Sequence, residues 1–275
     1  MTATGPVAVQ PLTRGTLARR AGRGAQQWMP AVVVLVVVLA VWQESIAAFH
    51  IKKFLAPQPS TIASTFWDDH GQLLRAGWFT FQEALGGYVI GCSLGLVAAL
   101  VLARWRGLGR ALLPYAIAAN AVPIIAFAPI TDAWFSPFSK VSKMAIAAVL
   151  CFFPVLVNAL RGLTSVQPAS IELMHSYAAG ETEIFRRVRI PTALPFVFTA
   201  LKVASVLAMI GAIVGEYFGG DFNALGVLIN SKSSTFDFKV AWAGIGVACA
   251  FGIAFYLAVA LAERVALRGQ PSTSE

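Results

Sequence analysis

Residues 193–217 read ALPFVFTALKVASVLAMIGAIVGEY, and only two of these side chains, Lys202 and Glu216, are charged. An α-helix needs about 20 mostly apolar residues to cross the hydrocarbon core of a bilayer. This run is long enough and apolar enough to do so. It therefore predicts a membrane-spanning helix.

The rest of the chain has the same character. Of the 275 residues, 57% are hydrophobic and 12% are charged, against about 25% charged in an average soluble domain. A soluble fold of this length would need more charge than that to cover its surface. We therefore predict an all-α, polytopic bundle of about six spans, at residues 29–49, 82–103, 111–133, 143–160, 193–217 and 240–262.

The spans divide the chain into three parts. Residues 1–27 are polar and basic and are expected to form a mobile cytoplasmic arm, residues 28–265 the transmembrane domain, and residues 266–275 a cytoplasmic tail. Four prolines (Pro114, Pro123, Pro129 and Pro154) interrupt the third and fourth spans. Proline is tolerated inside a span where neighbouring helices satisfy the freed carbonyl groups, so we expect kinked helices in a packed interior.

Basic residues predict the orientation. With the N-terminus inside, 13 of them fall on the cytoplasmic side and seven on the opposite side, and Lys202 lies within a span. Cytoplasmic flanks carry the excess of Lys and Arg, so both termini are expected in the cytoplasm. The same rule explains the net charge of +8, and binding of nucleic acid is not expected.

Small residues recur in the second span as Gly87, Gly91 and Gly95. This spacing lets two helices approach closely. We interpret it as packing within the bundle, with dimerisation as the alternative.

The longest cytoplasmic connection, residues 161–192, is expected to fold as two short amphipathic helices on either side of Ala178, Ala179 and Gly180. The first has an apolar stripe that includes Ile171 and Met174 and begins at Pro168. The second is expected to end before Pro191, because proline disfavours a helical residue before it. Such a hairpin either lies in the lipid headgroups or inserts into a groove of a cytosolic protein, and the pattern alone leaves both open.

The segment 168–195 resembles the EAA loop of the permease subunits of bacterial ABC importers. That motif has Glu-Ala-Ala, a Gly four residues later and a Leu-Pro. Aligned on Pro191, Glu172 takes the place of the motif's Glu, and Ala178 that of its Gly. Leu173 and Met174 replace the alanines, and Ile190 replaces the Leu. Neighbouring Gly180 is expected to supply the flexible backbone instead.

The resemblance covers about 200 residues, from the LAPQPS segment at residues 55–60 to the end of the sixth span. It is greatest to permeases for nitrate, sulfonate, taurine and pyrimidine-type precursors of thiamine or riboflavin. AVPIIAFAPI at residues 121–130, together with ELMHSYAA at 172–179 and LAMIGAIVGEYFG at 207–219, favours the last group. The family's Trp-Phe-Gly is Trp134-Phe135-Ser136 here, so that turn is expected to differ.

The resemblance implies a type I ABC importer permease with several partners. These are two cytosolic ATPases, which bind ATP and Mg, a second permease copy, a substrate-binding protein outside the membrane, and lipid. No cofactor is expected on this chain. The residues expected to contact the ATPase are Glu172, Leu173, Met174, Ser176, Ala178, Gly180, Glu181 and Phe185.

Polar groups within spans are costly and need a reason. Glu216 closes the fifth span and is expected either to face a substrate vestibule or simply to be hydrated at the interface. Asn120, Pro123 and Asn158 are further candidates for the substrate pathway. Lys202 is expected to reach the cytoplasmic interface with its long side chain.

The sequence contains neither G-x-x-x-x-G-K-[ST] nor H-E-x-x-H. The first motif holds ATP phosphates and the second holds zinc, so we expect neither an ATPase nor a metalloenzyme. The alternative is a secondary transporter driven by an ion gradient. Such a carrier usually has inverted repeats, and the two halves of this sequence show none.

Overall fold

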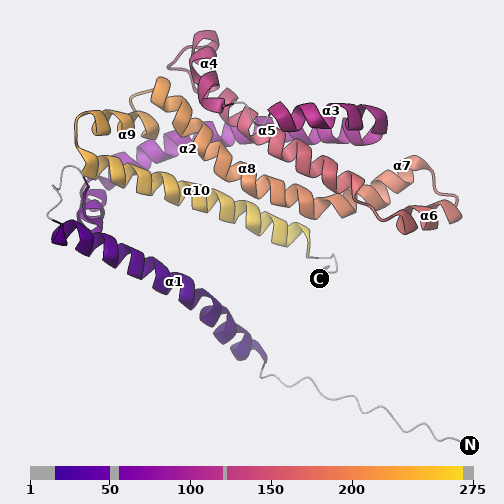
Figure 1. Cartoon of the computed structure of the whole chain (residues 1–275), viewed down its shortest axis with the longest axis horizontal. Helices are drawn as coiled ribbons and strands as arrows, with labels where there is room; N and C mark the ends of the chain where they lie inside the picture. The colour runs from indigo at the N-terminus through magenta and orange to yellow at the C-terminus, as the bar shows by residue number, and fades with distance from the viewer. Residues whose placement is uncertain (1–15, 50–55, 120–122, 269–275) are drawn as a thin grey trace, which may run out of the picture. The chain divides into compact units, whose positions relative to one another are not determined.

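The computed structural model describes residues 16–49, 56–119 and 123–268, and the chain forms two units, Met1–Ser60 and Thr61–Glu275. Within the described ranges every regular element is helical, which confirms the all-α prediction (Figure 1). The elements are α1 (Thr16–Ala48), α2 (Pro59–Arg104), α3 (Arg106–Ala119), η1 (Ile124–Phe127), α4 (Ala128–Phe135), α5 (Lys140–Thr164), α6 (Pro168–Ser176), α7 (Glu181–Ile184), η2 (Phe185–Arg189), α8 (Ile190–Phe218), α9 (Leu225–Ser234) and α10 (Phe238–Ala266).

Five helical segments among the described residues are long and apolar enough to cross a membrane. They contain the predicted first, second, fourth, fifth and sixth spans. The predicted third span, 111–133, is wrong as one continuous helix, because it is divided among α3, η1 and α4. Pro123 caps η1, and Pro129 lies in the first turn of α4. Both are positions where the missing N–H of proline costs no helical hydrogen bond.

The first unit contains α1. Its apolar part, Met29–Ala48, is a candidate membrane span. The helix begins at Thr16 and so extends into residues 16–27 of the predicted arm. Residues 1–15, which include Arg14, lie outside the described residues.

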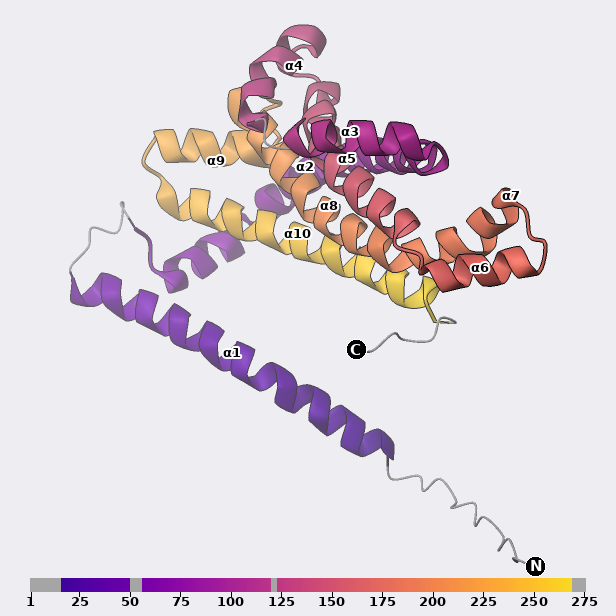
Figure 2. The ribbon, with the colours of Figure 1, turned by 45° about the vertical axis from the view of Figure 1, so that its right-hand side comes forward.

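In the second unit α5 and α8 pack side by side and antiparallel (Figure 2). A Cβ atom on Gly215 near the end of α8 would contact Ile146 near the start of α5, and one on Gly162 near the end of α5 would contact Ala193. Four fully buried alanines follow one another at intervals of four along α8, at positions 200, 204, 208 and 212. This stripe of small side chains lets the backbones approach closely.

Helix α2 packs against α5 through the predicted glycine stripe. A Cβ atom on Gly87 or Gly91 would overlap the backbone of α5 at Met144 or Ala148, and one on Gly95 would lie 2.8 Å from the carbonyl oxygen of Phe152. The stripe therefore serves packing within the chain. With 46 residues, α2 is about 69 Å long and extends well beyond a hydrocarbon core of about 30 Å.

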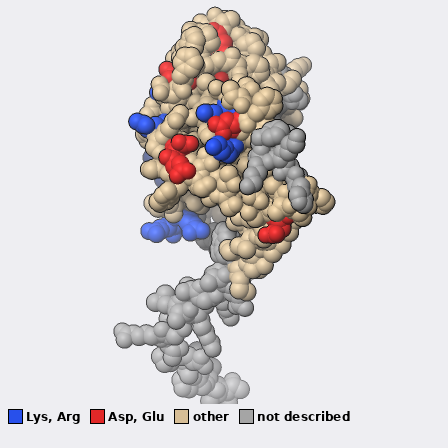
Figure 3. Space-filling view, turned by 90° about the vertical axis from the view of Figure 1, so that its left-hand side faces the viewer, with Lys and Arg blue, Asp and Glu red and all other residues tan. Residues whose placement is uncertain are grey.

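The bundle has two distinct ends. Helices α4 and α9 lie at one end of α5 and α8, whereas α6 and α7 lie at the other (Figures 1 and 2). We call these the α4–α9 end and the α6–α7 end. Figure 3 looks towards the α4–α9 end, where several acidic and basic side chains lie among mostly uncharged ones.

Candidate functional site

The α6–α7 loop projects from its end of the bundle and exposes apolar side chains. None of the residues of α6 is fully buried. Leu173 and Tyr177 are 57% and 75% exposed, and residues four apart lie on one face of a helix. Glu172 is exposed beside them. An exposed ridge that combines apolar groups with a carboxylate is suited to a groove on another protein.

The turn after α6 is closed by backbone hydrogen bonds. The N–H of Ala179 donates to the carbonyl of Met174 at 3.1 Å, and the N–H of Ala178 donates to that of His175 at 2.9 Å. These two bonds form the Schellman motif, in which the residue directly after the helix C-cap has a left-handed backbone conformation. Ala178 is that residue, with φ of 56°, whereas Gly180 has φ of −75°. The expectation that Gly180 supplies the flexible backbone is therefore wrong.

The second half of the loop anchors the ridge. Ile184 is fully buried, and Phe185 and Val188 are half-buried, so this segment buries an apolar face, as expected of the predicted amphipathic helix. The helix does not end before Pro191, contrary to prediction. It continues through the π-helical segment η2 into α8. In a regular α-helix the ring of Pro191 would clash with the carbonyl four residues earlier, and the wider π turn lies directly before it.

The predicted coupling residues thus come together on one loop. Most of them are exposed, namely Glu172, Leu173, Ser176, Ala178, Gly180 and Glu181, and two are half-buried, namely Met174 and Phe185.

The predicted pathway residues do not form one cluster among the described residues. Pro123 is exposed before η1, and Asn120 lies outside the described residues. Asn158 donates from its side-chain amide to the carbonyl of Pro154 at 2.8 Å, within α5. Its position towards the α6–α7 end separates it from Glu216, which lies near the α4–α9 end.

Glu216 is 1% exposed and does not face a vestibule in the structure. Its Oε1 accepts from the hydroxyl of Thr80, and its Oε2 accepts from the N–H of Gly226, both at 2.6 Å. The Thr80 hydroxyl oxygen in turn accepts from the N–H of Leu225 at 2.9 Å. The first N–H groups of a helix have no partners within it. Thr80 and Glu216 therefore cap α9 from two other helices, a role that the side chain of Ala224 cannot perform.

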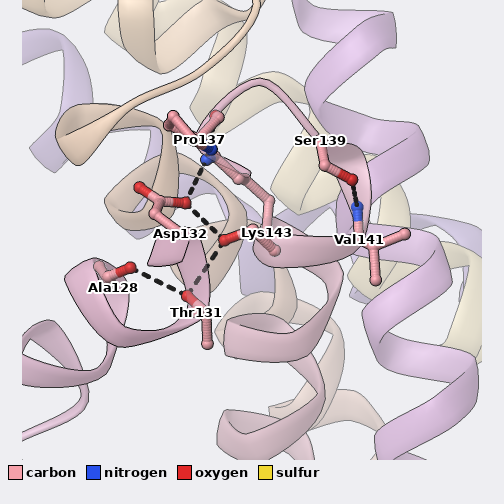
Figure 4. A network of polar contacts seen from close by, with 8 residues as sticks. Ala128, Thr131, Asp132, Pro137, Ser139, Val141 and Lys143 are labelled. Carbon is pink, nitrogen blue, oxygen red and sulfur yellow. Dashed lines mark hydrogen bonds and ion pairs between the residues drawn. The ribbon is translucent and has the colours of Figure 1, made fainter. Parts of the chain in front are cut away.

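Lys143 and Asp132 form a buried ion pair (Figure 4), and the positive charge of Lys143 acts on Glu216. Lys143 is 1% exposed and donates to Asp132 at 2.7 Å and to the carbonyl of Pro137 at 2.6 Å. Ser142 also donates to Asp132, and its oxygen lies 3.1 Å from that of Thr131. Removing one partner of a buried pair costs about 3–5 kcal/mol, so these bonds hold α4 against α5.

Glu83 completes this polar network, which we define as Thr80, Glu83, Asp132, Ser142, Lys143 and Glu216. Glu83 is buried next to Glu216, and its Oε2 has no hydrogen-bond partner among the residues that the structure describes. Neither Glu83 nor Lys143 is among the site residues predicted from the sequence. A carboxylate just inside the second apolar run was the available signal, since such groups need a partner.

Lys202 was expected to reach the cytoplasmic interface of the membrane, and in the structure it forms an ion pair. Its ammonium group donates to Glu263 of α10 at 2.7 Å, and both side chains are 20% exposed. This ion pair connects α8 with α10.

Comparison with known proteins identifies the family. Residues 91–268 match the model of the binding-protein-dependent transport system inner membrane component. The riboflavin transport system permease protein of Chloroflexus aurantiacus is 31% identical over 87% of this chain and 90% of its own. The formylaminopyrimidine transport permease protein of Halalkalibacterium halodurans is 30% identical over 88% of this chain and 96% of its own.

The fold agrees with this match. The crystal structure of an amino acid ABC transporter superposes with a TM-score of 0.59 at 17% identity, over 73% of this chain and 96% of that chain. At this low identity the similarity supports only the fold, which is that of a type I importer permease. The chain belongs to the family of binding-protein-dependent transport system inner membrane components, and it is a multi-pass inner-membrane permease of an ABC importer for small solutes.

Proposed function

We propose that this permease imports a flat, polar heterocycle, of the riboflavin or pyrimidine-precursor class. The support is the order of similarity. The riboflavin and formylaminopyrimidine relatives are 31% and 30% identical, against 27% for the taurine permease of Escherichia coli. Sulfonates, taurine and nitrate are the alternative substrates.

The α6–α7 loop docks into a cytosolic ATPase in this proposal. The observation that carries it is the exposed ridge of Leu173 and Tyr177 beside Glu172, on a helix without a buried residue. The buried Ile184 fixes the base of the ridge, so that movement of the ATPase reaches α8 through the continuous η2 segment. The ATPase binds ATP and Mg, and this chain needs no cofactor.

The importer contains two copies of this permease, two ATPases and an extracytoplasmic binding protein that delivers the substrate. The path lies between the permease copies, and Asn120, Pro123 and Asn158 are candidates to line it. The described part of α8 exposes apolar residues at helical spacing, Val203, Val206 and Ile210. A face of this kind is suited to contact with lipid or with a second copy.

Uptake into vesicles that contain the permease, its ATPase and its binding protein tests the proposal. Radiolabelled riboflavin or formylaminopyrimidine should enter only with ATP, and a sodium or proton gradient alone should not drive uptake. Uptake driven by a gradient without the ATPase would identify a secondary transporter.

Charge reversal tests the docking ridge in the same assay. Glu172→Lys and Leu173→Glu should abolish uptake and co-purification of the ATPase while the permease remains folded in the membrane, because a buried unpaired charge at an interface costs about 2–5 kcal/mol. Lys239→Glu is the matched control, since Lys239 is exposed at the α4–α9 end. Normal uptake and co-purification with Glu172→Lys would contradict the assignment.

A further inference from the structure

A cavity of about 490 Å³ lies at the α6–α7 end, between the junction of α2 with α3 and the segment formed by α7 and η2. Arg104 and Trp105 line it from the junction, whereas Glu181, Phe185 and Arg189 line it from the other side. Its volume is within the range of small-molecule sites, about 300–1,000 Å³. The polar network does not line it, and of the predicted coupling residues only Glu181 and Phe185 do.

The cavity lies at the depth of lipid headgroups. Arg104 ends α2 directly after the apolar run 82–103, and Trp105 follows it with an exposed ring. Tryptophan and basic residues gather where a spanning helix leaves the hydrocarbon core. A phospholipid beside α2 therefore places its phosphate at the level of this cavity.

An exposed apolar track leads to the cavity along α2. Val97 and Val101 are 58% and 40% exposed, and they precede Arg104 by seven and three residues. At this spacing the three residues share one face of the helix. An acyl chain that lies on the two valines brings the headgroup of the same lipid to Arg104.

The charges of the lining define the headgroup. Arg189 is 5% exposed and has other interactions within the protein, so it is a fixed positive charge in the cavity wall. Arg104 adds a second, exposed guanidinium, and guanidinium groups bind phosphate in a bidentate manner. Glu181 adds a carboxylate to the same lining. Two cations and one anion complement a headgroup that carries both a phosphate and a primary ammonium.

We propose that this cavity binds a phospholipid of the phosphatidylethanolamine class, with its phosphate at Arg104 and Arg189 and its ammonium at Glu181. The site does not depend on the proposed function, because it requires only that the chain lies in a bilayer. A lipid here would join the end of α2 to the base of the α6–α7 loop.

Native mass spectrometry of the purified, delipidated permease tests the site with phosphatidylethanolamine, phosphatidylglycerol, and inorganic phosphate. The wild type should bind phosphatidylethanolamine most tightly. Arg104→Gln should weaken this binding about tenfold, which corresponds to about 1.4 kcal/mol, because it removes charge-assisted hydrogen bonds to the phosphate. Arg104→Lys should have an intermediate effect. Arg161→Gln is the matched control, because Arg161 is exposed at the same end and does not line the cavity.

Glu181→Gln tests the headgroup assignment. It should remove the preference for phosphatidylethanolamine over phosphatidylglycerol, whereas Glu183→Gln should retain it, since Glu183 pairs with Arg187 outside the cavity. Thermal unfolding of each variant verifies that it is folded. Three results would overturn the proposal: equal binding of both lipids by the wild type, equal effects of Arg104→Gln and Arg161→Gln, or displacement of the lipid by millimolar inorganic phosphate.

Discussion

Ala178 and Ser136 hold backbone conformations that glycine adopts more readily. Their φ angles are 56° and 78°, and a side chain in the left-handed region costs about 1–2 kcal/mol. Both residues stand where the resemblance places a family glycine. The turn after Trp134-Phe135, which is expected to differ from the family's, has Ser136 at a positive φ. At Ala178 the two hydrogen bonds of the Schellman motif hold this conformation although the residue is not glycine.

We predict that Ala178→Gly raises the stability of the protein by about 1 kcal/mol, because it removes the steric strain at a positive φ. Gly180→Ala should not destabilise the protein, since a Cβ atom there would meet no atom within 4 Å. Thermal unfolding in detergent measures both effects, and a gain of 1 kcal/mol corresponds to a rise in Tm of about 2–4 °C. Loss of stability in Gly180→Ala, with no gain in Ala178→Gly, would mean that Gly180 is the strained position after all.

Helix α2 contains some glycines that are tightly packed against another helix and others that have free space around them. A Cβ atom on Gly91 would overlap the backbone of Ala148, whereas one on Gly71 would have no atom within 4 Å. Backbone cannot move as a flexible side chain does, so α2 and α5 would have to separate. The stripe of small residues therefore sets the distance between these two helices.

We predict that Gly91→Ala lowers stability by about 1–3 kcal/mol, the usual cost of overpacking. Gly71→Ala is the control on the same helix and should raise stability slightly, because alanine is the better helix former by about 1 kcal/mol. The midpoint of thermal unfolding in detergent, and the yield of folded protein, measure the difference. Equal effects of the two substitutions would show that α2 and α5 are not in close contact at Gly91.

Successive spans run in opposite directions across the bundle. The loops that connect them therefore lie in two sets, one at the α6–α7 end and one at the α4–α9 end. The α6–α7 end contains Arg104, Arg161 and the loop arginines, whereas the α4–α9 end contains Lys140, Lys232 and Lys239. The excess of arginine at the α6–α7 end favours this end as the cytoplasmic one.

We predict that a cysteine at Thr182 is protected from a membrane-impermeant thiol reagent in intact cells and that one at Ser234 is labelled. Both positions are exposed in the structure. Cys249 is also exposed, so the background should carry Cys249→Ser. Permeabilised cells are the control, and there both sites should react. Labelling of Thr182→Cys from outside would reverse the orientation and exclude contact with a cytosolic ATPase.

The sequence alone determined the membrane class, the position of most spans and the amphipathic loop at residues 161–192. Each of these follows from local properties, namely the length of an apolar run or the period of apolar side chains. The tertiary structure decided how the third span is divided, that Glu216 is buried, and that Ala178 carries the strained turn. The burial of Glu216 depends on a distant partner, because Thr80 and Glu216 lie 136 positions apart in the sequence. No local pattern of hydropathy encodes such contacts, because they form only when separate helices pack together.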